Sequence, residues 1–206
     1  MNYPNSRLRR LRYNSNIRSL VEDVHLKTSD LIYPVFVCEG ENIKQEIKSL
    51  PGQFRYSIDN LLSLIEELIS HNINSILLFG VSEKKDESGD IACDNKSIIP
   101  KAIIKIKEKY KNDILVIADL CNCSYTSHGH CGTIVDGDVD NDLTIKTLCK
   151  QAFTLAESGV DVIAPSDMMD GRTGIIRKEL DNKKFHKIPI FPYSVKYASS
   201  FYGPFR

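Results

Sequence analysis

The sequence predicts an α/β fold built on parallel strands. From residue 31 onward, short apolar runs alternate with amphipathic helical patterns. The runs are apolar at nearly every position, as in Ile114-Leu115-Val116-Ile117, which is typical of strands covered on both faces. Repeated β-then-α units favour a parallel sheet. Two architectures fit, an open doubly wound sheet and a closed (β/α)₈ barrel. No glycine-rich phosphate-binding fingerprint follows a strand, which weakens the dinucleotide-binding form of the first.

The pattern divides the chain into an N-terminal arm and one α/β domain. Residues 1–30 precede the alternating pattern and are expected to lie outside the core. The domain is expected to span residues 31–206, and its long charged loop Val81–Lys96 is of the kind that covers a site or contacts a neighbour. The predicted strands are Leu31–Cys38, Asn74–Gly80, Asp113–Asp119, Asp161–Pro165 and Ile188–Val195.

Helices are predicted between these strands, because apolar residues recur there every three or four positions. Ser57 is placed to cap the start of the first helix, and Pro100 fits only in the first turn of the second. Gly159 is expected to stop the third. The predicted helices are residues 58–69, about Ser97–Tyr110, a helix following Asp142, and about Gly174–Asn182.

Composition argues against several classes of function. The 206 residues include 27 basic and 27 acidic side chains, so the whole chain is not predicted to bind nucleic acid. The basic segment from Arg7 to Arg18 is interpreted as a solvated arm, a docking arm for another subunit or a local nucleic-acid contact. No apolar run approaches the roughly 18 residues of a membrane span, and no apolar region follows Arg9-Arg10 to form an export signal. We therefore expect a cytoplasmic protein without membrane contact.

A cysteine cluster directly after an apolar run is the most informative local feature. Cys121, Cys123 and Cys131 fall within eleven residues. Residues two apart on an extended chain point the same way, and the following loop can return the third cysteine to the first two. In a reducing compartment such clusters favour metal binding or catalysis over disulfides. Three thiolates with a free fourth position are typical of a working zinc site, whereas a ligand from His128 or His130 would complete a structural one.

Polar side chains also stand at the predicted carboxyl ends of three strands, where sites form in both α/β architectures. Asp119 ends the third strand, Ser166 the fourth and Lys196 the fifth. A lysine with a lowered pKa attacks carbonyl groups as the neutral amine and forms a Schiff base. Arg206 has the planar fork that clamps a carboxylate. The structural alternatives are a loop cap for Asp119, a turn for Ser166 and solvated surface charges for Lys196 and Arg206.

Longer segments around these residues resemble one enzyme family. The match runs along essentially the whole chain, including Arg9-Arg10-Leu11-Arg12 and Leu31–Val37. The segments that carry it are Asp119–Gly132 with Val139–Asp142, Ala164–Gly171 and Ser194–Arg206. In this order they are similar to the signatures of porphobilinogen synthase, the 5-aminolevulinate dehydratase family.

The resemblance implies a (β/α)₈ TIM barrel with an N-terminal arm that embraces a neighbouring subunit, usually in a homo-octamer. The implied reaction condenses two 5-aminolevulinate molecules asymmetrically to porphobilinogen, with loss of two waters, in tetrapyrrole and haem biosynthesis. Lys196 would match one of the family's two Schiff-base lysines. Some members replace the cysteines with aspartates and depend on magnesium, so the thiols retained here favour catalytic Zn²⁺. The implied metal ligands are Cys121, Cys123 and Cys131, and the implied substrate-binding residues are Arg206, Phe205, Asp119 and Ser166.

The resemblance further predicts that the sequence is C-terminally incomplete. Family members continue well beyond the motif that ends at Arg206, and about five of the eight strands of a barrel are expected here. We therefore expect little or no turnover from the isolated chain. One alternative is an inactive truncated remnant that binds zinc or docks on intact subunits. Another is an unrelated Schiff-base lyase on a (β/α)₈ scaffold, which would leave the cysteine loop unexplained.

Overall fold

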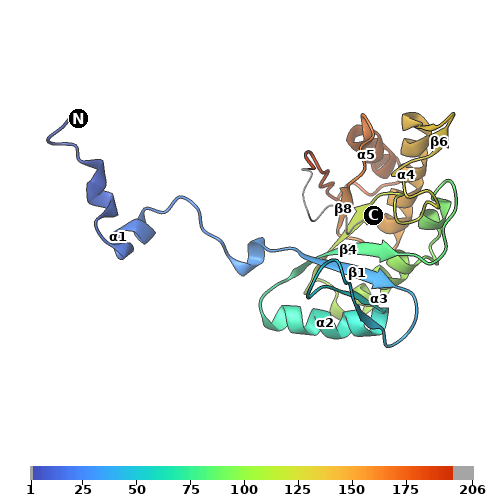
Figure 1. Cartoon of the computed structure of the whole chain (residues 1–206), viewed down its shortest axis with the longest axis horizontal. Coiled ribbons are helices and arrows are strands. Elements are labelled where there is room, and N and C mark those ends of the chain that lie inside the picture. Colours follow the sequence, from blue (N-terminus) through green and yellow to red (C-terminus); the bar gives the residue numbers. More distant parts are fainter. Residues whose placement is uncertain (1, 197–206) are drawn as a thin grey trace.

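The structure is a computed structural model that describes residues 2–196. It consists of an α/β domain and an N-terminal arm that projects from it (Figure 1). The main sheet has six strands in the order β2-β3-β1-β4-β5-β8. Their bounds are β1 Tyr33–Cys38, β2 Lys44–Glu46, β3 Phe54–Tyr56, β4 Ser75–Val81, β5 Leu115–Leu120 and β8 Val162–Pro165.

The order of the parallel strands resolves the choice between the two architectures. β1, β4, β5 and β8 are parallel, and each pairs with the next of them along the chain. A doubly wound sheet reverses its strand order at a switch point, whereas a barrel adds its strands in one direction. The unreversed order is therefore that of a partial (β/α)₈ barrel, as the family resemblance predicts.

Two short strands extend the sheet beyond β1 and were not predicted. β3 pairs in parallel with β1, and β2 is antiparallel to β3. β2 has the sequence Lys-Gln-Glu and is exposed throughout, so it carries no apolar pattern. A separate hairpin of β6 (Ile134–Val135) and β7 (Asp138–Val139) follows the cysteine segment. Its turn at Asp136-Gly137 has positive φ at both residues, the conformation of a tight hairpin turn.

The four predicted helices are confirmed, and each contacts the next along the chain. Asp140 caps α4, because its Oδ1 accepts a hydrogen bond from the Leu143 amide at 2.8 Å. Gly159 follows the end of α4 with a φ of 90°, a conformation that favours glycine. Arg172 begins α5, two residues before the predicted start. The bounds are α2 Ile58–Ser70, α3 Ile98–Tyr110, α4 Asn141–Glu157 and α5 Arg172–Asn182.

The predicted cap of α2 was wrong in its detail. Ser57 occupies the N-cap position but makes no side-chain cap hydrogen bond. Its Oγ instead accepts a hydrogen bond from the Ile43 amide at 2.8 Å. The hydroxyl therefore ties the segment before β2 to the start of the helix.

The predicted fifth strand, residues 188–195, is present only as a single bridge. Ile190 pairs in parallel with Ile163 of β8. Three backbone hydrogen bonds join residues 189–193 to Ile163 and Pro165, so the segment runs beside β8. Pro189 has no amide hydrogen with which to extend this ladder.

The two faces of the sheet differ in character. Helices α2–α5 pack on one face, where fully buried side chains such as Ile76, Leu78 and Leu148 form the main core. The other face carries a smaller cluster that includes Ile117 and Val162. In a barrel this second face is the interior, and its polar residues lie at the carboxyl ends of the strands.

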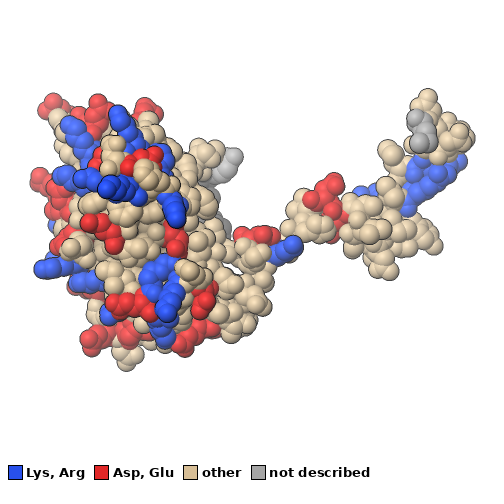
Figure 2. Space-filling view, turned by 180° about the vertical axis from the view of Figure 1, so that it is seen from behind, with Lys and Arg blue, Asp and Glu red and all other residues tan. Residues whose placement is uncertain are grey.

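The arm makes no contribution to the core. It contains two short 3₁₀ helices, Leu8–Arg12 and Thr28–Asp30, and the helix α1, Ser15–Leu20. None of its described residues is buried, and large apolar side chains such as Leu8 and Leu20 are more than 80% exposed. Figure 2 shows basic side chains gathered on the arm, while charges of both signs are interspersed over the domain. Among the described residues, none of the helices combines the length and apolar character needed to cross a membrane.

Candidate functional site

The candidate site lies at the carboxyl ends of β5 and β8. The Ser166 amide donates a hydrogen bond to the Leu120 carbonyl at 3.2 Å, which places the two strand ends side by side. Asp119 belongs to the same end of β5, and Cys121 follows directly. The segment that contains Lys196 runs beside β8. The three predicted polar strand ends are thus brought together.

Cys121, Cys123 and Cys131 form a compact sulfur cluster, as predicted. Their Sγ atoms all lie within 4.8 Å of one another, and those of Cys121 and Cys123 are 3.3 Å apart. Thiolates bound to one zinc ion at about 2.3 Å lie about 3.8 Å from each other in a tetrahedral site, so the observed spacing fits a shared metal ion. Cys121 is only 3% exposed, and the other two are half-buried.

The three thiols share their protons unequally. Hydrogen bonds from Cys121 and Cys123 hold the pKa of Cys131 far below its ordinary value. The corresponding bonds to Cys123 and Cys131, together with burial, raise the pKa of Cys121. A cation bound at the cluster would take the place of protons on these thiols.

Neither histidine of the loop belongs to the sulfur cluster. Nε2 of His128 lies 3.0 Å from the Glu87 carbonyl, and its Nδ1 accepts a hydrogen bond from the His130 amide at 3.1 Å. Among the described residues, the group suited to a metal ion contains the three cysteines alone. The described residues therefore bring three cysteines, and neither histidine, to the cluster.

The charged loop 81–96 packs on the cysteine loop. Asp86 forms a bridge with Thr126, and its amide donates a hydrogen bond to the Tyr125 carbonyl at 3.0 Å. Gly89 lies against Asn122, which stands between the first two cysteines and is fully buried. The amide nitrogen and oxygen of the Asn122 side chain have no hydrogen-bond partner among the described residues. The loop therefore packs against the segment that carries the first two cysteines.

Asp119 and Lys196 lie beside the sulfur cluster. Burial raises the pKa of Asp119 to about 7, against the opposing influence of the Ser166 side chain and the Lys196 ammonium. Its Oδ1 is buried and accepts no hydrogen bond from a described residue. The Lys196 ammonium donates a hydrogen bond to the Ser166 carbonyl and also lowers the pKa of Cys131. The Lys196 ammonium, the Asp119 carboxyl group and the cysteine thiols thus lie close enough together to interact electrostatically.

Three residues of this neighbourhood were not predicted. The Lys196 ammonium lies over the ring of Tyr193, 5.7 Å from its centroid. Nε of Arg172 lies 3.2 Å from Oδ2 of Asp167, whose side chain is fully buried. Asp167 directly follows Ser166, so its charge and its position next to a predicted site residue could have identified it from the sequence. The predicted substrate-binding residues Phe205 and Arg206 lie outside the described residues.

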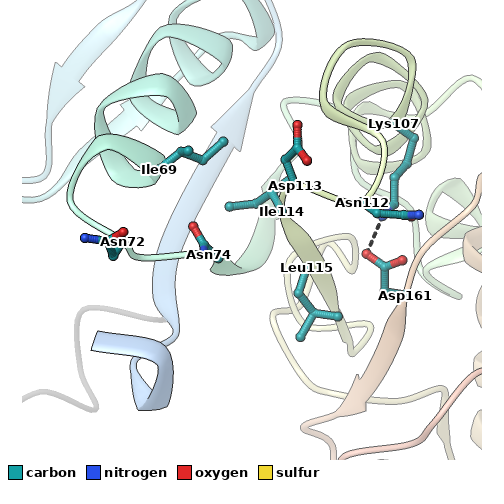
Figure 3. A pocket seen from close by; sticks show the side chains of 9 residues that line it. All are labelled: Ile69, Asn72, Asn74, Lys107, Asn112, Asp113, Ile114, Leu115 and Asp161. Carbon is teal, nitrogen blue, oxygen red and sulfur yellow. Dashed lines mark hydrogen bonds and ion pairs between the residues drawn. The ribbon is translucent and has the colours of Figure 1, made fainter. Parts of the chain in front are cut away.

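A hollow of about 560 Å³ lies at the opposite end of the sheet (Figure 3). It is lined by the residues that precede β4, β5 and β8, among them Asn74, Asp113 and Asp161. Lys107 and Asp161 form an ion pair at 2.5 Å on its wall. In barrels this amino-terminal end serves stability, and the chemistry takes place at the other end. The hollow is therefore separate from the candidate site.

The fold and the cluster define a class of protein: an α/β chain with barrel winding and a thiol cluster suited to a metal ion at the carboxyl ends of its strands. Comparison with known proteins then identifies the family. The family model "Delta-aminolevulinic acid dehydratase" matches residues 5–206. The chain belongs to the delta-aminolevulinic acid dehydratase family.

Individual relatives agree with this assignment. The chain is 50% identical to the delta-aminolevulinic acid dehydratase of Methanothermus sociabilis over 206 residues, which are 100% of this chain and 64% of the relative. It is 48% identical to the protein of that name from Ruminiclostridium josui, over 97% of each chain. The Toxoplasma gondii ME49 enzyme, crystallised with the reaction product porphobilinogen, matches with a TM-score of 0.92 at 42% identity. That match covers 98% of this chain and 58% of the other. The chain thus spans less than two thirds of the length of the Methanothermus relative.

Proposed function

We propose that the chain acts as a zinc-dependent porphobilinogen synthase, a lyase that condenses two 5-aminolevulinate molecules asymmetrically to porphobilinogen in tetrapyrrole and haem biosynthesis. The observation that carries the proposal is the meeting of the sulfur cluster and Lys196 at one end of the sheet. The ammonium lies close enough to lower the pKa of both Cys131 and Asp119. A metal site and an amine nucleophile in one neighbourhood are what a condensation of two amino-ketones requires.

The donor set supports zinc as the metal. Cys121, Cys123 and Cys131 supply three soft sulfur ligands at a spacing that fits one ion, and zinc prefers such ligands over the oxygen donors that magnesium takes. A bound zinc ion supplies Lewis-acid polarisation of a substrate oxygen. The cysteines would hold the ion by giving up their protons.

Lys196 is proposed as the Schiff-base lysine. Its neutral amine attacks the ketone carbon of one 5-aminolevulinate, and the ketone oxygen leaves as water when the carbon–nitrogen double bond forms. The Ser166 carbonyl, which accepts a hydrogen bond from Lys196, orients the amine before the substrate arrives. The buried Oδ1 of Asp119 has no hydrogen-bond partner among residues 2–196 and is proposed to accept a hydrogen bond from a substrate N–H or O–H group. Arg206 and Phe205 are proposed, on the family resemblance, to bind the substrate carboxylate and line its pocket.

The arm is proposed to dock on a second copy of the chain in a homo-oligomer, an octamer by the family resemblance. Its exposed apolar side chains, such as Leu8 and Leu20, support docking because a solvated arm gains nothing from them. A cytoplasmic location is proposed because all six cysteines are free, as expected in a reducing compartment.

A second candidate is a chain that binds zinc and docks on other subunits without turnover. The observation that favours it is the exposure of apolar side chains near the site, with Met168 65%, Phe191 49% and Val195 59% exposed. Such side chains, in the loop after β8 and in the segment that runs beside β8, call for a covering surface.

The test measures product and adduct separately on the 206-residue chain loaded with zinc. A colour assay for the pyrrole detects porphobilinogen, and borohydride added with 5-aminolevulinate traps the Schiff base for localisation by mass spectrometry. The proposal expects an adduct on Lys196 with little pyrrole from the 206-residue chain, and both adduct and pyrrole from a form extended at its C-terminus, with the Lys196→Ala variant as the control for the adduct. An adduct without pyrrole in the extended form as well supports the second candidate. An adduct at another lysine, or none, contradicts the role of Lys196.

A further inference from the structure

The segment that carries Lys196 is weakly anchored by its backbone. Its hydrogen bonds to β8 end with the Tyr193 amide, which donates to the Pro165 carbonyl at 2.9 Å. In the described part of the chain, no backbone hydrogen bond joins residues 194–196 to the sheet. The lysine therefore lies three residues beyond the last backbone anchor, and something else must set its direction.

The side chain of Arg172 provides a second anchor at Tyr193. Its Nη2 donates to the Tyr193 carbonyl at 2.9 Å, and its Nη1 donates to the Met169 carbonyl at 3.1 Å. Its Nε pairs with Oδ2 of Asp167 at 3.2 Å, with the two side chains 15% and 0% exposed. Oδ1 of Asp167 accepts the Met169 amide at 2.7 Å. One planar guanidinium thus joins the loop after β8 to the lysine-bearing segment in three directions.

The same loop also receives the head group of Lys196. Its ammonium donates to the carbonyl of Ser166, the residue directly before Asp167, and lies over the ring of Tyr193. The contacts therefore form a closed ring. Arg172 links Asp167 to Tyr193, and Lys196 links Tyr193 to Ser166, the residue before Asp167. Removal of the guanidinium would break this ring at the Tyr193 carbonyl without removing any of the thiols.

We infer that Arg172 is a positioning residue for Lys196, which it aims at the carboxyl end of β8 by holding the Tyr193 carbonyl against the Asp167 loop. This inference rests on the proposed function, because it concerns the lysine that forms the Schiff base there. Arg172 touches neither the sulfur cluster nor the reacting amine, and acts only through the segment that it holds.

Arg177 offers a matched control on the same helix. Its Nη1 donates to the Ile188 carbonyl at 2.6 Å and its Nη2 to the Phe185 carbonyl at 2.8 Å, and it pairs with Asp181 at 2.6 Å. It therefore makes two carbonyl bonds and one ion pair, as Arg172 does, but to the beginning of the segment. A general loss of α5 packing affects both variants, whereas a loss of lysine positioning affects only the Arg172 variant.

The experiment compares wild type, Arg172→Gln and Arg177→Gln as zinc-loaded 206-residue chains. The rate of borohydride trapping of 5-aminolevulinate on Lys196 is expected to fall about tenfold or more in Arg172→Gln, since small misplacements of a reacting group have effects of this size. Arg177→Gln is expected to trap at nearly the wild-type rate. Zinc content is expected to be equal in all three, which shows that the cluster is intact.

Methylation of Lys196 by formaldehyde and borohydride gives a second readout that needs no substrate recognition. Release of the ammonium from the Ser166 carbonyl is expected to speed this methylation severalfold in Arg172→Gln, relative to Lys187 in the same chain. Slower trapping together with faster methylation is the signature of lost positioning. Equal methylation in the three proteins, or equal changes in both variants, overturns the inference. A wild-type chain that forms no adduct with 5-aminolevulinate contradicts the proposed function, and the methylation comparison still decides the role of Arg172.

Discussion

The ammonium of Lys196 donates a hydrogen bond to the carbonyl oxygen of Ser166, so the end of β8 holds the head group of a lysine that comes from the next segment of the chain. A lysine held this way is oriented before any substrate is present. In the proposed reaction the amine exchanges its hydrogen bond with the Ser166 carbonyl for contact with the substrate. Testable consequences follow for the site around Lys196 and Ser166, for the Lys107–Asp161 ion pair at the amino-terminal end of the strands, and for the arm.

The first prediction concerns the metal. Joint replacement of Cys121, Cys123 and Cys131 by Ala should reduce bound zinc from about one ion per chain to nearly none, because three thiolates make one site. Elemental analysis by mass spectrometry after dialysis measures the content. The Cys93→Ala, Cys149→Ala double variant is the matched control and should keep its zinc. Unchanged zinc in the triple variant would remove these cysteines from the ligand set.

The second prediction concerns the pH dependence of two cysteines outside the cluster. Burial raises the pKa of Cys93 and of Cys149 to about 11. Only the thiolate reacts with iodoacetamide, so their alkylation in the folded protein should rise about tenfold per pH unit without levelling off near the pKa of a free thiol, about 8.5. Mass spectrometry of peptides sampled over time at pH 7 to 10 gives the rates. A plateau near pH 9 would show that neither thiol feels the burial described.

The third prediction concerns the Lys107–Asp161 ion pair at the amino-terminal end of the strands. Oδ2 of Asp161 accepts the Val116 amide at 2.7 Å and pairs with Lys107 at 2.5 Å. Asp161→Ala leaves the Val116 amide unpaired and the Lys107 ammonium with only the Lys111 carbonyl, so the free energy of unfolding should fall by about 1–3 kcal/mol. Lys105→Ala breaks an exposed pair with Glu108 and should change it by less than about 0.5 kcal/mol. Urea titration measures both, and equal effects would refute the distinction between the two pairs.

The fourth prediction concerns the close approach of Tyr125 to β4. A Cβ added at Gly80 would clash with the Tyr125 hydroxyl, so Gly80→Ala must displace the ring and should lower stability by about 1–3 kcal/mol. The displaced ring should also weaken zinc binding, because Tyr125 belongs to the cysteine loop. Gly174→Ala meets nothing within 4 Å and should stabilise α5 by up to about 1 kcal/mol. Thermal unfolding and zinc titration test both variants.

The fifth prediction concerns the arm. No described residue of the arm is buried, so deletion of residues 2–30 should leave the unfolding free energy of the isolated domain nearly unchanged. The same deletion should reduce the mass of the oligomer, because it removes the exposed apolar side chains that are proposed to dock on a second copy. Sedimentation analysis measures the mass. An oligomer of unchanged size would show that the arm does not dock.

The sequence predicts the helices and the sulfur cluster well, because both depend on local spacing. α3 was expected at Ser97–Tyr110 and is found at Ile98–Tyr110, since apolar residues on one helical stripe must face the core. Cys121 and Cys123 were expected to face one point, and their sulfur atoms lie 3.3 Å apart. In both cases the covalent spacing of the chain nearly determines the geometry.

Features that depend on distant parts of the chain were beyond such reasoning. β2 is polar and exposed, and it becomes a strand only because β3 offers a pairing edge. The hydroxyl of Ser57 bonds to the amide of Ile43, fourteen residues away. The three contacts of Arg172 join two segments whose proximity follows only from the tertiary fold. The spacing of residue types along the sequence gives no information about these long-range contacts.

The one-directional order of the parallel strands has a consequence for how the chain folds during its synthesis. β4 adds to β1, β5 to β4 and β8 to β5, so each new strand finds its pairing edge already made when it leaves the ribosome. Each pairing spans one crossover of the chain rather than its whole length, and the N-terminal part of a chain is made and can fold first during synthesis. The sheet can therefore grow strand by strand while translation continues.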